Sequence, residues 1–158
     1  MPLPLGAPVP PFQATAAVSG RVITQSDVKG NGVLVVHGAK TADAAKDVSK
    51  AVRTKWPKTT DVFLASIVDL RSFAGIWKRV AEAQVKSTYE KLAAKATEAG
   101  LDAKEQVLIC PDWDGAISQA LGVAEPDKEA AAIVVKAGKV VAVATGKDIA
   151  QQVMAALG

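Results

Sequence analysis

Sulfur and aromatic rings are scarce in this chain of 158 residues. It contains one cysteine, Cys110, and one histidine, His37, and only 4% of its residues are aromatic. A single cysteine excludes an internal disulfide, so nothing in the sequence requires an oxidising compartment. With so few rings, the core must be packed from alanine and valine through many small contacts between closely spaced elements.

Targeting signals and long apolar runs are also missing. The opening MPLPLGAPVPPF has no positively charged stretch followed by a long apolar one, and no apolar run approaches the ~18 residues of a membrane span. We therefore expect no membrane span and a cytoplasmic protein, or a periplasmic one if a leader peptide preceded this sequence. The net charge of +3 is too small to indicate nucleic acid as a partner.

Common catalytic and ligand-binding signatures do not occur. The sequence has no glycine-rich phosphate loop, no His-x-x-x-His, no G-x-S-x-G elbow and no paired-cysteine zinc pattern. The lone histidine has no cysteine partner for nucleophilic catalysis and no further metal ligands at local spacing. We predict no cofactor and no metal site.

What the sequence does contain is a regular alternation of strand and helix patterns. Apolar runs predict strands at 12–15, 20–24, 33–37, 61–70, 105–110, 130–135 and 139–145. Apolar positions repeating every three or four residues predict helices at 43–56, 75–99, 114–121 and 147–157. This order predicts an α/β fold with a mixed central sheet, helices on both of its faces and an N-terminal β-hairpin, in a single domain over residues 1–158.

Four strings follow one another at characteristic spacing: LGAPVPPF, SGRVITQSDVKGNGVLVV, LICPDWDGAISQALGV and AAAIVVKAGKVVAVATG. In this order they resemble the thioredoxin-fold redoxins, the branch that includes alkyl hydroperoxide reductases, thiol-specific antioxidant proteins and membrane-tethered thioredoxin-like proteins. The resemblance covers nearly the whole chain. It implies a thioredoxin-like three-layer α/β/α sandwich.

The same resemblance exposes two departures from active redoxins. Their cysteine pair matches Ala42 and Ala45 here, so the helix N-terminus that lowers a thiol pKa in the family has no thiol to act on. Their cis-proline, which presents backbone to an extended substrate, matches about Glu129, and the nearest proline is Pro126. Both departures predict that conventional thiol exchange is lost.

Cys110 has two interpretations. It is either an inert, half-buried strand residue or a one-cysteine reductant or oxidation sensor. Asp112 and Asp114 follow it closely, and carboxylates near a thiol raise its pKa. The sequence therefore favours the inert interpretation.

Other polar residues surround the vestigial motif. His37 is predicted to be structural or to hydrogen-bond within the cleft with Lys40, Thr41 or Asp43. A basic helix face carries Lys46, Lys50 and Arg53, which is typical of a solvated surface and less often of a site for an acidic partner. In the long helix we expect Trp77, Lys78, Arg79 and Tyr89 to be partly exposed if Val80 and Leu92 face the sheet, available for core packing, self-association or docking.

We therefore expect a redoxin-like protein without catalytic cysteines that binds a protein or peptide as a chaperone, adaptor or subunit, with homo-oligomers as one possible assembly. The predicted binding residues are His37, Lys40, Thr41, Asp43 and Glu129. The alternative is a thiol-dependent oxidoreductase or redox sensor that uses Cys110.

Overall fold

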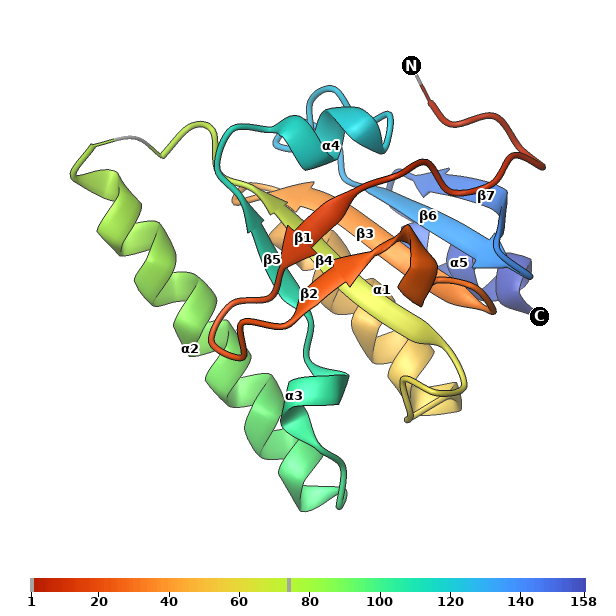
Figure 1. Ribbon diagram of the computed structural model, residues 1–158, viewed down its shortest axis with the longest axis horizontal. Coiled ribbons are helices and arrows are strands. Elements are labelled where there is room, and N and C mark those ends of the chain that lie inside the picture. The colour runs from red at the N-terminus through yellow and green to blue at the C-terminus, as the bar shows by residue number, and fades with distance from the viewer. Residues whose placement is uncertain (1, 74) are drawn as a thin grey trace.

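A mixed five-stranded sheet forms the centre of the molecule (Figure 1), a computed structural model that describes residues 2–73 and 75–158. Its strands lie in the order β5-β4-β3-β6-β7. The strands are β3 (Gly32–Gly38), β4 (Phe63–Asp69), β5 (Ile109–Asp112), β6 (Ala131–Lys136) and β7 (Lys139–Thr145), and a separate N-terminal hairpin is formed by β1 (Gln13–Thr15) and β2 (Val22–Thr24). The helices are α1 (Ala42–Lys55), α2 (Trp77–Glu98), α3 (Ala103–Gln106), α4 (Ala116–Ala120) and α5 (Ile149–Leu157), with a single 3-10 turn, η1 (Gln25–Asp27).

The central strand β3 is buried along its whole length, as its unbroken apolar run predicts. It runs parallel to β4 and antiparallel to β6. Successive side chains point to opposite faces, so Val33 and Val35 contribute to one core cluster while Leu34 and Val36 contribute to another. The small valine and alanine side chains of these clusters confirm the expectation of a core with few rings.

Long helices cover only one face of the sheet. Helices α1 and α5 pack together there, on the cluster that contains Val33 and Val35. The opposite face is covered by the β1-β2 hairpin, the N-terminal segment around Phe12 and the short α4 with Leu121 (Figure 1). The predicted mixed α/β architecture with an N-terminal hairpin is confirmed, although the two covering layers are unequal.

Helix α2 lies along the β5 edge of the molecule and is exposed over most of its surface (Figure 1). Its buried stripe is formed by Ala81, Val85 and Tyr89, spaced four residues apart. The prediction that Val80 faces the sheet and Tyr89 is exposed is therefore wrong. Val80 is 43% exposed and Tyr89 only 7%, because the helix is rotated so that the tyrosine ring fills the gap beside the sheet edge.

The strand predicted at 105–110 is displaced along the chain. Residues Ala103–Gln106 form the short helix α3, whose start is capped by the Asp102 carboxylate accepting from the Lys104 N–H at 3.0 Å. Strand β5 instead continues through Pro111 to Asp112. A proline is tolerated there because β5 is an edge strand that pairs with β4 alone.

The predicted hairpin at 130–145 and the last helix are confirmed. Strands β6 and β7 form an antiparallel hairpin whose turn places Ala137 and Gly138 at positive φ. Helix α5 buries Ile149, Val153 and Leu157. Across the described ranges, none of the helices combines the length and the apolar composition needed to cross a bilayer.

Candidate functional site

Ala42 and Ala45 lie where the fold brings several strand ends together. Strand β3 ends at Gly38, and α1 begins at Ala42 after a three-residue connection. In sheets of this kind, ligands commonly bind at the carboxyl ends of the parallel strands. Here those ends belong to β3, β4 and β5, and neither alanine supplies a group that can ionise.

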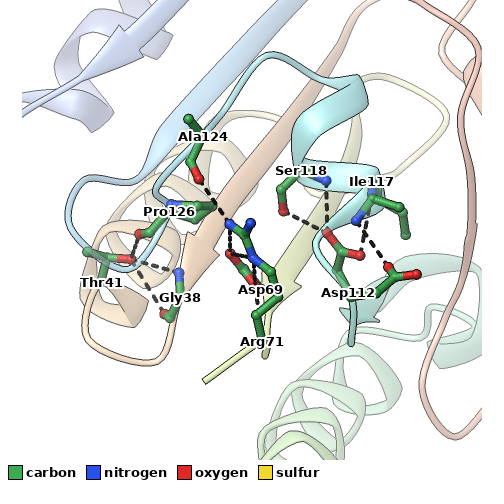
Figure 2. Close-up of polar contacts among 11 residues, drawn as sticks. Gly38, Thr41, Asp69, Arg71, Asp112, Ile117, Ser118, Ala124 and Pro126 are labelled. Carbon is green, nitrogen blue, oxygen red and sulfur yellow. Dashed lines mark hydrogen bonds and ion pairs between the residues drawn. The ribbon is translucent and has the colours of Figure 1, made fainter. Parts of the chain in front are cut away.

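A loop from the other side of the sheet is fastened over this position (Figure 2). The Thr41 hydroxyl donates to the carbonyl of Pro126 at 2.6 Å, and the Gly38 N–H donates to the same carbonyl at 3.2 Å. The Lys40 N–H donates to Oδ1 of Asp127 at 3.0 Å. These hydrogen-bonding groups at the end of β3 are therefore already paired with the loop between α4 and β6.

Gly38 is required for this close approach. A Cβ placed on Gly38 would overlap the Cα and carboxylate of Asp127. Because the overlap includes backbone, a side chain at this position cannot be accommodated by a simple rotation of Asp127. The absence of a side chain at the end of β3 therefore allows the loop to dock.

An ion pair at the end of β4 holds the same loop from its other side. The guanidinium of Arg71 donates to both oxygens of Asp69, at 2.7 to 3.1 Å, and its Nη2 also donates to the carbonyl of Ala124 at 2.9 Å (Figure 2). Asp69 is 5% exposed and Arg71 35%. Burial raises the pKa of the Asp69 carboxyl, but the side-chain and backbone hydrogen bonds from Arg71 and its charge together hold that pKa below its ordinary value.

A second buried carboxylate organises α4 beside this pair. Asp112 is 2% exposed, and its Oδ2 accepts from the Ser118 N–H at 2.8 Å and the Ser118 hydroxyl at 2.7 Å (Figure 2). Its Oδ1 accepts from the Ile117 N–H at 3.3 Å. Gly115, which precedes α4 at positive φ, leaves room for the guanidinium of Arg71, because a Cβ there would collide with it.

Between these elements lies a depression of about 300 Å³. The residues that line it come from the end of β4 and from the docked loop: Asp69, Arg71, Ser72, Ala124, Glu125, Asp127 and Lys128. Charges of both signs meet at its rim, and Lys128 is paired with Glu125 at 3.1 Å. Six of these seven residues carry polar or charged side chains.

Cys110 lies two residues before Asp112 on β5 but has no contact with solvent. Its side chain belongs to the core cluster on the sheet face opposite α1, because Cys110 pairs with Ile67, which pairs with Val36. It is 0% exposed, and burial raises the pKa of its thiol to about 12. The sequence-based preference for an inert cysteine agrees with this placement, but the cause is burial and not the nearby carboxylates.

The predicted binding residues differ in their placement. Lys40, Asp43 and Glu129 are exposed, whereas Thr41 is half-buried and bonded to Pro126. His37 is 7% exposed, and its Nδ1 lies 2.9 Å from the carbonyl oxygen of Gly38, to which it donates. Burial lowers the pKa of His37, an effect only partly offset by that carbonyl, so the ring is neutral at neutral pH.

The predicted basic face of α1 is only partly a solvated surface. Lys46 and Lys50 are exposed, but Nη1 of Arg53 donates to the carbonyls of Trp56 and Val62 at 3.2 and 2.9 Å. Burial lowers the pKa of Arg53 to about 10, partly opposed by the charge of Asp61. Arg53 therefore secures the connection that follows the helix and does not contribute to a docking surface.

The polar residues that define this site were missed from the sequence. Asp69, Arg71 and Asp127 lie at or after strand ends and in the docked loop and belong to no recognisable motif, whereas Asp112 lies within the string LICPDWDGAISQALGV. The available signal was the position of Asp69 near the end of the strand predicted at 61–70 and of Asp112 two residues after the strand predicted at 105–110. Within the described residues, no group of three or more histidine, cysteine or acidic side chains is placed to hold a metal ion.

The strand order, the crossover helix α1 and the antiparallel hairpin after the docked loop define a thioredoxin-like fold. Solved structures of this class superpose on nearly the whole chain. StoA from Bacillus subtilis matches with a TM-score of 0.61 at 13% identity, covering 96% of this chain and 99% of its own. The thioredoxin domain of a thiol-disulfide oxidoreductase from Bacteroides vulgatus matches with a TM-score of 0.60 at 15% identity, covering 99% of both chains.

A DsbF homologue from Corynebacterium diphtheriae gives a similar result, with a TM-score of 0.60 at 16% identity over 96% of this chain and 85% of its own. No protein-family model matches the sequence, and no curated protein matches it significantly. At these identities the likeness establishes the fold. The chain itself carries one cysteine and no Cys-x-x-Cys pair on that fold.

Proposed function

We propose that this protein is a non-catalytic binding module of thioredoxin-like fold that recognises a protein or peptide at the carboxyl ends of β3 and β4. One observation carries the proposal. The position that would hold reactive cysteines carries Ala42 and Ala45, while the one cysteine, Cys110, is buried on the other face of the sheet. Without a reachable thiolate, the fold retains its surface but not its redox chemistry.

The proposed contact surface combines exposed groups from three segments. Lys40 and Asp43 flank the start of α1, Glu129 precedes β6, and Arg71 with Asp127 borders the depression between them. Charged groups of both signs at short spacing favour a polar peptide segment, since each charge on the partner finds an opposite charge here. His37 and Thr41 support this surface from within, because their side chains hydrogen-bond to backbone carbonyls of the protein itself.

A disulfide-reduction assay tests the non-catalytic part. We expect wild-type protein to leave the rate at which dithiothreitol reduces insulin at its uncatalysed value. Cys110→Ser should behave identically. The double variant A42C/A45C restores the cysteine spacing at the start of α1 and serves as the positive control for the geometry. Wild-type activity that disappears in Cys110→Ser would instead establish the rival function, a redox protein that uses its single cysteine.

Comparative affinity capture tests the binding part. The charge-reversal variant K40E/E129K alters the proposed surface at constant net charge, and K95E/E98K makes the same change at the exposed far end of α2. We expect proteins captured by the wild type to be depleted with the first variant and retained with the second, as measured by quantitative mass spectrometry. Equal capture by all three proteins would contradict this surface.

A further inference from the structure

The start of α2 exposes large apolar side chains. Ile76 is 81% exposed, Trp77 60% and Val80 43%, and all three lie within the first turns of the helix. Tryptophan and isoleucine normally bury most of their surface in a folded protein. A cluster of three at one point marks a surface that contacts something apolar.

Rotation of the helix cannot hide this cluster. The stripe formed by Ala81, Val85 and Tyr89 already packs against the sheet edge. Ile76 and Val80 lie on the outward side, about half a helical turn from the centre of that stripe. Turning them inward would expose Tyr89, so their exposure is built into the register of the helix.

The N-terminus of α2 differs from the usual helix N-terminus in two ways. The N-cap residue is Ile76, which provides no side-chain cap, and the first turn contains no acidic residue. It contains instead Lys78 and Arg79, whose positive charges are repelled by the positive end of the helix dipole. Local features that cost helix stability are expected at functional sites.

We propose that the start of α2, residues Ile76–Val80, docks on an anionic lipid surface. Ile76, Trp77 and Val80 would enter the boundary between headgroups and acyl chains, and Arg79 would meet the anionic headgroups. Lys78, whose Nζ lies 4.9 Å from the centre of the Trp113 ring, would add its positive charge from beside that ring. Tryptophan suits this boundary because its ring is apolar while its N–H can bond to polar groups. The positive charges at the start of α2 therefore favour an anionic lipid surface as the partner.

The shape of the region agrees with a lipid partner. Helix α2 lies at the edge of the molecule, and its start is directed away from the sheet (Figure 1). The depression beside Arg71 and the one beside Val85 are lined by other residues, and the apolar cluster contributes to neither. A projecting apolar tip with cations fits a deformable, negatively charged layer.

Vesicle co-sedimentation tests the proposal with the full chain. The vesicles contain phosphatidylcholine alone or an equal mixture of phosphatidylcholine and phosphatidylglycerol. We expect binding only to the anionic vesicles, weakened by added salt, and weakened about 30-fold in K78Q/R79Q, because each cation near such a surface contributes roughly fivefold. The matched control K91Q/K95Q removes the same charge from the exposed far half of α2 and retains binding.

The apolar contribution is tested separately. I76S/W77S is expected to abolish binding, while Val22→Ser, at an exposed valine of the hairpin, leaves it unchanged. Far-UV circular dichroism confirms that each variant is folded. The proposal is overturned if wild type ignores anionic vesicles, if the tip variants bind like wild type, or if the tip variants abolish only self-association seen by light scattering, which would assign the cluster to a second copy.

Discussion

The reactivity of Cys110 gives a quantitative test of the lost thiol chemistry. Burial raises the pKa of its thiol from 9.0 to about 12. Since only the thiolate reacts, this change alone lowers the reactive fraction at neutral pH about a thousandfold. The side chain is also 0% exposed, so a reagent reaches it only when the sheet opens. We therefore expect native protein to be labelled by a disulfide reagent at least about a thousandfold more slowly than denatured protein.

An exposed cysteine provides the reference rate. Ser87 lies on the exposed side of α2, so the double variant C110A/S87C presents one accessible thiol on the same fold. Its labelling in the native state is expected to match that of denatured wild type within a few fold. Rapid, stoichiometric labelling of native wild-type Cys110 would refute both the burial and the conclusion that this cysteine has no part in chemistry.

Three further predictions concern the polar framework. Asp112→Ala removes the acceptor of three hydrogen bonds, including two from Ser118, and should lower the free energy of unfolding by about 3 kcal/mol in urea titrations, with Asp112→Asn costing less. The pKa of Asp69 is held below its ordinary value of 3.8 in the folded state, so the unfolded state binds the proton first as the pH falls. The stability from this ion pair is therefore full above the unfolded pKa and is lost as the pH falls through the lower folded pKa, and Asp69→Asn should flatten that pH dependence at the cost of stability at neutral pH. Thr41→Val removes the 2.6 Å hydrogen bond to the docked loop, so amide exchange should accelerate in that loop and not in β7, where equal acceleration would indicate global destabilisation.

The sequence predicts accurately those elements whose buried residues recur at one regular spacing. Strand β3, buried on both faces, and helix α5, with Ile149, Val153 and Leu157 on one side, lie within two residues of their predicted limits. In helix α2 the prediction is wrong for Val80, which is exposed, but Leu92 packs against the same cluster as Val85 and Tyr89. Small, evenly distributed apolar residues do not define the phase of a helix, and only the sheet edge selects the stripe that contains Tyr89.

The candidate site is less predictable for a different reason. The bond from Thr41 to Pro126 joins residues 85 positions apart, and local patterns contain no information about such pairs. Gly38 illustrates the difficulty, because a glycine at a strand end is usually assigned to a turn, whereas here it makes space for Asp127. The absence of cysteines at Ala42 and Ala45 could be read from the sequence, but the loop bonded to Gly38, Lys40 and Thr41 could not.

The docked loop also places a carboxylate ahead of the start of α1. Oδ1 of Asp127 accepts from the Lys40 N–H at 3.0 Å, directly ahead of α1, where the positive end of the helix favours an anion. In the A42C/A45C background, this carboxylate should raise the pKa of the thiol introduced at position 42, because its negative charge repels the thiolate. Asp127→Asn keeps an acceptor but removes the charge, so it should shift the pH profile of iodoacetamide alkylation to lower pH. An unchanged or higher midpoint would mean that the Asp127 carboxylate does not act on the thiol at position 42.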